Sequence, residues 1–408
     1  MDTNYTVENI RLSGDASPAP NSLDAFFDHL TTVFGPVGTP RLYFQNHWFA
    51  DPNRDDKGVF VAICKSPAEI ASSVRVYRRN VNFLEDLQYS VGGIGDVATL
   101  PSHTRRGLAQ RLLQASVDYM AATGIDVSVL HTSTAVPLYA KLGWKVCVMF
   151  LTTCEIGAGL GPLAQPGLQC RQIDFEADLE TIKALYRISE TQLVASFRRD
   201  SDFYWKEYIG NYQDSRRTVI SGIVTGQDGV AGYAILEASN AELAQFRSHP
   251  ETASAPTINI REVFVGRPIK QGQVELVPLD TFARYLESLV AWAISRLGLT
   301  STDAAKLRFP SALLPNEVLD RISASTGSAW ASRTHRQNVQ DGGWMWKIIR
   351  PIRLPSPTPG EEQQVLGPGD EDDLAKYLRQ PVGIYCGCAG NIACPGTERY
   401  GFLRSDSF

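Results

Sequence analysis

The chain has 408 residues, which predicts two or more domains, and its 43% of hydrophobic residues is enough for packed cores. A net charge of −5 argues against a general nucleic-acid binder, which usually carries a basic domain. No apolar run reaches the roughly 18 residues that a membrane span needs, so we expect no membrane partner. The start of the chain is polar and lacks the features of a signal peptide, and seven scattered cysteines, an odd number, indicate a reducing compartment. We therefore expect a cytoplasmic protein.

The first part of the chain reads as a helix followed by strands. Residues 1–22 are polar, and Ser22 is placed to cap a helix over 23–34 that the pair Gly35–Pro36 ends. Apolar and alternating segments then predict strands over 58–64, 70–83 and 93–100. These elements predict a mostly antiparallel sheet with flanking helices.

A loop with two arginines and a glycine separates the last of these strands from a long helix. The segment Arg105-Arg106-Gly107-Leu108-Ala109 stands at the helix start, and apolar residues then recur at helical spacing. A helix N-terminus presents unsatisfied N–H groups and a partial positive charge, and a glycine lets a ligand approach the backbone. Together these features predict a seat for a pyrophosphate. An ordinary strand–loop–helix corner with solvated arginines is the alternative interpretation.

The segment after this helix predicts a second strand and a short helix. Residues 125–130 read as a buried strand. Pro137 suits the first turn of a helix and Gly143 suits its end, with Tyr139 between them.

In this order of elements, the stretch from Val91 to Trp144 resembles the GNAT N-acetyltransferase superfamily. The family's pyrophosphate signature is Gln/Arg-x-x-Gly-x-Gly/Ala after a strand that ends in x-x-Pro, and PSHTRRGLA at 101–109 matches it. A later family element, a tyrosine followed by a Gly-Phe/Trp ending, is matched by LYAKLGW at 138–144. The first signature position holds Thr104 where the family has Gln or Arg, and the neighbouring arginines are placed to compensate.

The resemblance implies a fold and a co-substrate. The implied fold is α/β (α+β layered), a mixed, mostly antiparallel GNAT sheet flanked by helices, with acetyl-CoA as co-substrate and no metal. The loop amides would hold the pyrophosphate, the N–H of Val97 would polarise the acetyl carbonyl, and Thr99 would pair with the pantetheine arm. The implied cofactor-binding residues are Val97, Ala98, Thr99, Thr104, Arg105, Arg106, Gly107, Leu108 and Ala109.

Tyr139 matches the family's proton donor to the leaving thiolate. A phenol with a pKa of about 10 keeps its proton at pH 7, and a thiolate with a pKa near 8.5 can accept one. A core tyrosine that packs the short helix is the alternative.

A second unit repeats the order of the first, which we expect to span 1–155. The segment 156–167 has the composition of a linker, and residues 168–350 form the repeat. Its helices, hairpin and strands are predicted over 179–186, 204–208, 218–224 with 230–236, 258–265, 279–297 and 304–309. Its loop before the long helix lacks an arginine–glycine seat, so we predict a degenerate GNAT-like domain that has lost cofactor binding. This tandem arrangement resembles the enhanced-intracellular-survival (Eis) and fungal lysine acetyltransferase group.

The general base is left open. Many GNAT enzymes place a glutamate on the strand before the loop, at a position that falls on Gly93, and Asp96 faces the other side unless a bulge re-aims it. Eis-type enzymes use their C-terminal carboxylate, and this chain ends in Phe408. His131 matches a pocket histidine of the same group and either relays a proton or caps its strand. Water is a further candidate.

Residues 351–408 read as a Pro/Gly-rich and acidic C-terminal tail, with an acidic run at 370–373. Cys386, Cys388 and Cys394 have a spacing that invites a zinc interpretation, but a structural zinc takes four ligands and no histidine lies nearby in sequence. We favour buried or adventitious thiols and predict no metal site.

We predict an N-acetyltransferase that moves an acetyl group from acetyl-CoA to a primary amine by direct attack in a ternary complex. The acceptor is expected to be a small molecule, such as an amino acid, a polyamine or an aminoglycoside-like compound. A protein-lysine acetyltransferase and a non-catalytic acyl-CoA-binding regulatory protein are the alternatives. The cluster His47, Trp48 and Phe49 is either a hydrophobic plug before a turn, which we favour, or a wall of the acceptor pocket. No motif encodes the oligomeric state, and the resemblance allows a homo-oligomer.

Overall fold

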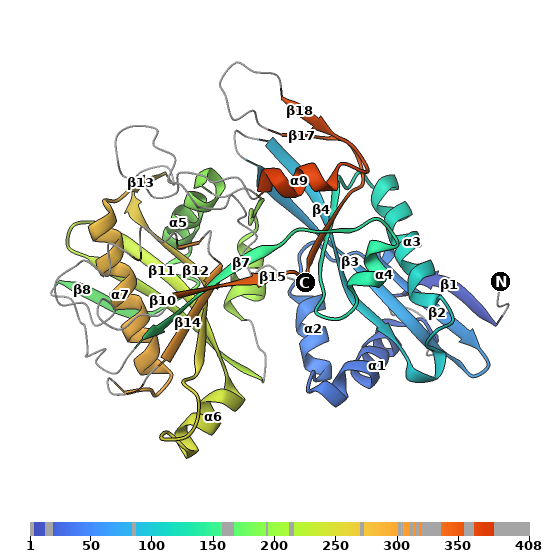
Figure 1. The fold of residues 1–408 in the computed structure, drawn as a ribbon, viewed down its shortest axis with the longest axis horizontal. Coiled ribbons are helices and arrows are strands. Elements are labelled where there is room, and N and C mark those ends of the chain that lie inside the picture. The colour runs from blue at the N-terminus through green and yellow to red at the C-terminus, as the bar shows by residue number, and fades with distance from the viewer. Residues whose placement is uncertain are drawn as a thin grey trace.

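The computed structural model describes most of the chain and places two sheets side by side (Figure 1). The described residues are 4–12, 19–83, 87–156, 167–192, 195–211, 216–269, 273–300, 303, 305–310, 313–314, 319, 336–354 and 363–378. Each sheet has eight strands within these ranges, and helices cover both sheets, so the expected α/β class with two GNAT-like lobes is confirmed. We call the lobe built on the N-terminal sheet the first lobe and the other the second lobe.

The first lobe is built on a mostly antiparallel sheet. In spatial order its strands are β1 (Tyr5–Asn9), β2 (Val59–Lys65), β3 (Ala68–Phe83), β4 (Leu87–Thr99), β5 (Val127–His131), β16 (Trp344–Ile348) and β6 (Lys145–Val146), with β9 (Ser196–Phe197) paired to β3. Its helices and 3-10 turns are α1 (Leu23–Phe34), η1 (Gly35–Val37), α2 (Arg41–Phe49), η2 (Asp56–Gly58), η3 (Pro101–His103), α3 (Leu108–Ala122) and α4 (Val136–Ala140).

Helix α1 has the bounds that the sequence predicted. The side chain of Ser22 accepts a hydrogen bond from the N–H of Ala25, which satisfies one of the free donors at the helix start. Its apolar face packs with α2 on the sheet, in a core cluster that includes Phe26, Phe27 and Trp48. These two helices form one wall of the cavity described below.

The parallel pair β4–β5 opens into a wedge. Strand β5 pairs with β4 only where Val91–Gly93 lie opposite Val127–Val129, and helix α3 makes the crossover between the two strands. Beyond Gly93 the strands separate, so the edge of β4 that follows has no ladder with β5. An opened strand edge leaves backbone donors and acceptors that another molecule can pair with.

The second lobe repeats this plan. In spatial order its strands are β15 (Arg336–Asp341), β7 (Met149–Ile156), β14 (Ala305–Pro310), β12 (Thr257–Pro268), β11 (Ala231–Ser239), β10 (Arg217–Gly226) and β8 (Leu168–Gln172), with β13 (Val274–Leu276) paired to β12. Its helices are α5 (Leu179–Gln192), the π-helix η4 (Tyr204–Gly210), α6 (Asn240–Ser248) and α7 (Leu279–Arg296). The predicted hairpin, strand, long helix and final strand are confirmed as β10–β11, β12, α7 and β14.

The wedge of the second lobe is filled by its own chain. Strands β12 and β14 are parallel over Thr257–Asn259 with α7 as their crossover, as β4 and β5 are with α3. Gly266 pairs with Ala231 of β11 on one side and with Leu276 of β13 on the other. Strand β13 therefore lies along the edge of β12 that the first lobe leaves open at β4.

Three strands lie in a different sheet from the one that the boundaries expected from sequence imply, and one of them is β9, which falls in the expected unit 168–350 but pairs with β3 of the first sheet. Strand β7, expected to close the unit 1–155, lies in the second sheet between β15 and β14. Strand β16, within the expected unit 168–350, lies in the first sheet and pairs with β5. The alternation of apolar residues indicates that a strand is buried but does not encode which sheet it joins.

A buried ion cluster lies where η4 of the second lobe meets the first. The carboxylate of Asp51 accepts hydrogen bonds from Arg79 at 3.0 and 3.1 Å and from Arg75 at 3.3 Å, and all three side chains are buried. The guanidinium of Arg79 also lies over the rings of Tyr204 and Tyr208, at 5.5 and 5.2 Å from their centroids. Charge pairing and ring contacts thus join the two lobes behind the cavity.

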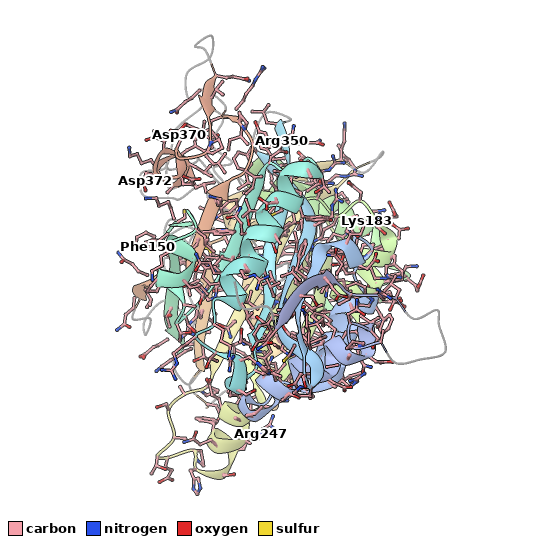
Figure 2. The ribbon with its side chains drawn as sticks, turned by 90° about the vertical axis from the view of Figure 1, so that its right-hand side faces the viewer. Phe150, Lys183, Arg247, Arg350, Asp370 and Asp372 are labelled. Carbon is pink, nitrogen blue, oxygen red and sulfur yellow. The ribbon has the colours of Figure 1, made fainter. Side chains whose placement is uncertain are left out.

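The expected tail contains regular structure. Residues after Pro351 form β17 (Ile352–Leu354), β18 (Gln364–Leu366) and α9 (Glu371–Leu378), and the acidic run supplies the first turn of α9. Asp372 on α9 and Arg247 on α6 lie at opposite ends of the molecule (Figure 2). Among the described helices, none combines the length and apolar character needed to cross a membrane. The segment 157–166 of the expected linker, Cys386, Cys388, Cys394 and Phe408 lie outside the described residues.

Candidate active site

The wedge between β4 and β5 opens into a cavity of about 560 Å³. One side is formed by β4, the opposite side by the end of β5 and by α4, and a third by α1 and α2. The predicted site residues that line it are Val97, Thr99, Ala109, His131 and Tyr139, together with the candidate base Asp96. Candidate residues that lie far apart along the chain therefore meet in one cavity.

A bulge turns Asp96 toward this cavity. Ser73 and Arg75 of β3 lie opposite Ala98 and Gly95 of β4, so two residues of β4 face one of β3, and Asp96 has a left-handed φ of 50°. The bulge that Asp96 needs in order to face the cavity is therefore present.

The carboxylate of Asp96 is held by neighbouring side chains. Its Oδ2 accepts a hydrogen bond from the hydroxyl of Tyr77 at 2.9 Å and lies 3.8 Å from Nη1 of Arg75. Burial raises the pKa of Asp96, against the opposing effect of the Arg75 charge. Asp96 is the one carboxylate in the lining among the residues that the structure describes.

The residues after the bulge alternate between the two faces of β4. Val97 and Thr99 line the cavity, and the hydroxyl of Thr99 is 2.8 Å from that of Ser72. Ala98 points to the opposite face, where it packs with α1 and α2, and its carbonyl accepts a hydrogen bond from Ser72. Of these three predicted cofactor residues, Ala98 therefore turns its side chain away from the cavity.

The loop before α3 forms an open turn at the helix N-terminus. Gly107 is the N-cap with a left-handed φ of 72°, and among the described residues, apart from Gly107 and its two chain neighbours, no atom lies within 4 Å of the place where a side chain would begin. The hydroxyl of Thr104 donates to the carbonyl of Pro101 at 3.0 Å. Arg105 and Arg106 are exposed, and Leu108 is buried beneath the loop. An exposed cationic turn with free space over its glycine fits a pyrophosphate seat.

Tyr139 is presented by the short helix α4. Its ring meets Trp144 edge-on, with 6.2 Å between centroids, and 6% of the residue remains exposed, on the cavity side. Burial raises the pKa of Tyr139 to about 12. The phenol therefore keeps its proton at neutral pH.

His131 is held by the turn between β15 and β16. Its Nε2 lies 3.1 Å from both carboxylate oxygens of Asp341, and Trp344 meets the imidazole edge-on at 5.0 Å. A side chain on Gly343 would begin 2.7 Å from Nε2, so only glycine lets the turn approach this closely. Asp341 was missed by sequence analysis, and the doublet Gly342–Gly343 was the one local signal of a tight turn.

Helix α2 contributes different residues from those expected. Tyr43 and Phe44 line the cavity, whereas His47 and Trp48 are buried behind them and Phe49 is 54% exposed. Burial lowers the pKa of His47 to about 4. The favoured interpretation of a hydrophobic plug holds for His47 and Trp48.

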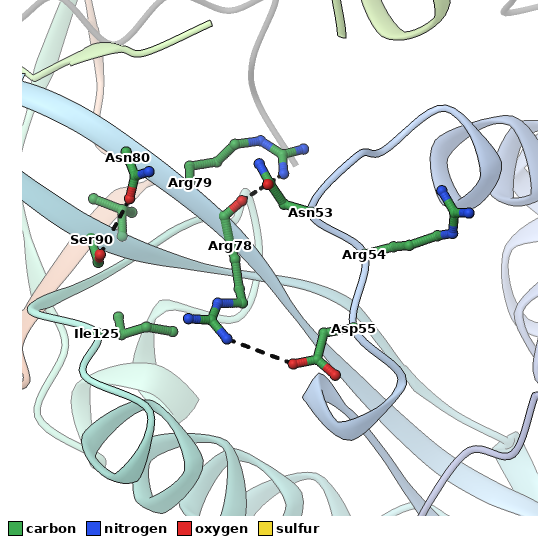
Figure 3. A pocket seen from close by; sticks show the side chains of 9 residues that line it. Asn53, Arg54, Asp55, Arg78, Arg79, Asn80, Ser90 and Ile125 are labelled. Carbon is green, nitrogen blue, oxygen red and sulfur yellow. Dashed lines mark hydrogen bonds and ion pairs between the residues drawn. The ribbon is translucent and has the colours of Figure 1, made fainter. Parts of the chain in front are cut away.

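A smaller cavity of about 330 Å³ lies beside β3 at Arg78, Arg79 and Asn80 (Figure 3). Arg54 and Arg78, which line it, interact with other groups of the protein. Arg78 lies 3.7 Å from Asp55, and Arg54 points away from Arg78 and donates to the carbonyls of Phe49 and Asp51. None of the predicted site residues lines this cavity.

Comparison with known proteins defines the class of the first lobe. Residues 17–147 match the family model described as an acetyltransferase (GNAT) domain. The chain therefore carries a GNAT acetyltransferase domain, which is an acyltransferase domain, and the resemblance drawn from Pro101–Ala109 and Tyr139 is confirmed at that level. A search by sequence finds no match among curated proteins.

Solved structures of similar fold extend beyond this domain. A probable N-acyltransferase from Enterococcus faecalis V583 is 14% identical, with 85% of this chain and 73% of that chain covered and a TM-score of 0.57. A GCN5-related N-acetyltransferase from Anabaena variabilis is 13% identical, with 92% and 89% covered and a TM-score of 0.57. Eis1 from Mycobacterium abscessus is 16% identical, with 84% and 74% covered and a TM-score of 0.51. At these identities the likeness is one of fold, and it includes the second lobe.

Proposed function

We propose that this chain transfers an acetyl group from acetyl-CoA to the primary amine of a small molecule. The observation that carries the proposal is the convergence of Val97, His131 and Tyr139 on one cavity that begins beside the open turn at Gly107. A cavity of about 560 Å³ is in the range of small-molecule sites, which run from roughly 300 to 1,000 Å³.

The turn and the wedge are assigned to binding. When bound, acetyl-CoA supplies the acetyl group and a thiolate leaving group. The N–H groups at the start of α3 and the space over Gly107 suit its pyrophosphate, with Arg105 and Arg106 adding charge. The edge of β4 that leaves β5 suits its amide-bearing arm, and the N–H of Val97 in the bulge is assigned to the acetyl carbonyl.

Tyr139 is assigned as the general acid. With a pKa of about 12, its hydroxyl carries a proton throughout the neutral range. Giving that proton to a thiolate whose conjugate acid has a pKa near 8.5 runs uphill by about 3.5 pKa units, about 5 kcal/mol, so the step requires that the tyrosinate regain a proton as the thiol leaves. Holding this proton in the cavity avoids the need for a proton from bulk water at the moment of thiolate departure.

His131 is assigned as the base that takes a proton from the attacking amine, with Asp341 as a positioning residue. Contact of Nε2 with both oxygens of Asp341 fixes the ring and leaves Nδ1 for proton transfer. Asp96 is the other candidate base that the structure describes, and its carboxylate already accepts a hydrogen bond from the hydroxyl of Tyr77. This assignment chooses one of the alternatives that the sequence left open.

The proposal is tested by calorimetric titration with acetyl-CoA, followed by a thiol-release assay over a panel of small amines and lysine peptides. We expect binding near micromolar acetyl-CoA and thiol release with one class of small amine. Release with lysine peptides alone would replace the proposal by a protein-lysine acetyltransferase. Binding without release from any amine would replace it by an acyl-CoA-binding regulatory protein.

A further inference from the structure

A tyrosine near the start of the chain contacts the turn 104–107, which precedes α3. Tyr5 of β1 is buried, and its hydroxyl lies 2.8 Å from Nδ1 of His103 in η3. Its ring meets the imidazole edge-on, with 5.6 Å between centroids, and the guanidinium of Arg106 lies 5.9 Å from the centroid of the same ring. Leu108, the first residue of α3, belongs to the same buried apolar cluster as Tyr5. Tyr5 therefore contacts the chain just before the turn and again within it.

The imidazole of His103 is held from two sides. Its Nε2 lies 3.2 Å from Oε1 of Glu69 on β3, and the ring is buried between this carboxylate and Tyr5. An ionised carboxylate only accepts hydrogen bonds, so Nε2 carries a proton, and in the neutral imidazole Nδ1 then accepts a hydrogen bond from the hydroxyl of Tyr5. The series Tyr5–His103–Glu69 thus joins β1, η3 and β3 at the residue that precedes Thr104.

The turn beside this series has a strained backbone. Arg105 has a left-handed φ of 61°, in addition to the left-handed φ of Gly107. A residue with a Cβ rarely adopts this conformation, which persists only where the surrounding structure holds it. Turns of this kind can aim successive backbone N–H groups into a concavity that suits an anion. Arg105 lies between the two residues that Tyr5 contacts, so the series holds the turn on both sides of its strained position.

We propose that Tyr5, held by His103 and Glu69, is a positioning residue that keeps the turn 104–107 in the shape that binds the pyrophosphate of acetyl-CoA. This inference rests on the proposed function and adds residues outside the family motif to its cofactor site. A turn that becomes ordered only on binding loses affinity to the entropy of that ordering. A turn that is already fixed avoids this loss, and the ring of Tyr5 also orients the guanidinium of Arg106.

The test compares two acetyl donors, of which only one has a pyrophosphate. S-acetylpantetheine has the thioester and the amide-bearing arm of acetyl-CoA but lacks the pyrophosphate and the nucleoside. The kcat/KM for thiol release is measured with each donor for the native chain, for Tyr5→Phe, which loses the hydroxyl, and for Tyr5→Leu, which also loses the ring. Tyr119→Phe is the control, because it removes a hydroxyl that donates to Asp55 at 2.6 Å near the far end of α3. Thermal unfolding checks that each variant is folded.

We expect Tyr5→Phe to lower kcat/KM for acetyl-CoA by about 2- to 10-fold, the usual range for one hydrogen bond. Tyr5→Leu should lower it by more than about 10-fold, because the ring contact with Arg106 is lost as well. Both variants should keep kcat/KM for S-acetylpantetheine within about twofold of the native value, and Tyr119→Phe should behave as the native chain with both donors. Equal losses for the two donors would overturn the inference, as would an unchanged kcat/KM for acetyl-CoA in Tyr5→Leu.

A double variant tests whether the ring of Tyr5 orients Arg106. Arg106→Gln should weaken the binding of acetyl-CoA to the native chain. In the Tyr5→Leu background the same change should weaken binding by a smaller factor, because a guanidinium that is no longer oriented contributes less. Equal factors in the two backgrounds would contradict the orientation of Arg106 by Tyr5.

Calorimetric titration with CoA separates this inference from the proposed function. CoA has the pyrophosphate but no acetyl group, so its affinity tests the turn without any turnover. CoA affinity that falls in Tyr5→Leu, with no thiol release from acetyl-CoA by the native chain, would support the positioning role and reject the transfer activity. Thiol release by chains that bind CoA with equal affinity would reject the positioning role and support the transfer. Neither CoA binding nor thiol release in the native chain would reject both.

Discussion

Nε2 of His131 lies 3.1 Å from each carboxylate oxygen of Asp341, although the two residues are 210 positions apart in the chain. The contact exists because the chain leaves the second sheet at Asp341, the end of β15, and enters the first sheet at Trp344, the start of β16, opposite His131. A cavity residue of the acetyltransferase domain is therefore oriented by a residue outside the segment that the family model matches.

Asp341→Asn should lower kcat by about 10- to 100-fold with little change in the KM for acetyl-CoA, because it alters the orientation of a base and not a binding surface. In a His131→Ala background the same change should have no further effect, since Asp341 acts through His131. Asp280→Asn, an exposed carboxylate on α7, is the matched control. Additive losses in the double variant would contradict the coupling.

Gly107→Val should weaken acetyl-CoA binding more than 10-fold, because a branched side chain over the turn blocks a ligand that approaches the backbone. Gly229→Val is the control, since Gly229 has a φ of 75° against 72° for Gly107 and, among the described residues, also has no atom within 4 Å of the new Cβ apart from its own and those of its two chain neighbours. Both variants carry the same backbone strain of about 1–2 kcal/mol and should lose similar thermal stability. If calorimetry found equal acetyl-CoA affinities for the two variants, the cofactor turn would be misplaced.

Tyr139→Phe should lower kcat by about 100-fold or more while acetyl-CoA affinity is kept, because the ring contact with Trp144 survives and only the proton is lost. Since burial raises the pKa of Tyr139 to about 12, the native rate should show no loss from this group as the pH rises to 10. A stopped assay at pH 7 to 10 checks both statements. A Tyr139→Phe variant that keeps the native kcat would refute the assignment, and a fall in the native rate near pH 9 that is absent in the variant would contradict the raised pKa.

The free energy of unfolding should fall as the pH drops from about 6.5 to 4. Burial lowers the pKa of His29 and of His47 to about 4, so each stays neutral in the folded chain while the unfolded chain binds protons below 6.5. Nothing is lost above pH 6.5, where both states are neutral, and the loss in the free energy of unfolding reaches about 3 kcal/mol for each residue by the time the pH falls to 4.

Urea unfolding at pH 7.5, 5.5 and 4.5 measures this loss. The double variant His29→Gln/His47→Gln should lose less free energy of unfolding between those pH values than the native chain does. His249→Gln, an exposed histidine after α6, should lose as much as the native chain. An unchanged loss in the double variant would mean that other groups cause the acid sensitivity.

Local elements and the family motif were readable in the sequence. Ser22 capped α1 as predicted because a side-chain oxygen at a helix start has one obvious partner, and the β12–α7–β14 unit followed from its apolar periodicity. The motif residues Val97, His131 and Tyr139 were named on resemblance, and they do lie on one cavity. Their catalytic roles remain predictions.

Long-range placement was not readable. Arg216 lines the cavity and Asp341 contacts His131 only because strands of one lobe enter or approach the other, and no local pattern in either segment points to a partner so far away. The expected boundary at 155 was wrong for β7 for the same reason, because apolar alternation leaves the choice of sheet open. The sequence showed that Asp96 would face the cavity only if a bulge turned it, but whether that bulge forms depends on the register between β3 and β4.

Strand β13 distinguishes the second lobe from the first, where the corresponding edge of β4 is not paired with β5 beyond Gly93. By lying along β12 it satisfies that strand's edge internally, so the second lobe keeps a complete sheet without any ligand in its wedge. Among the described residues, the second lobe instead contributes to the surroundings of the first lobe's cavity: Arg216 lines that cavity, and Asp341 holds the imidazole of His131.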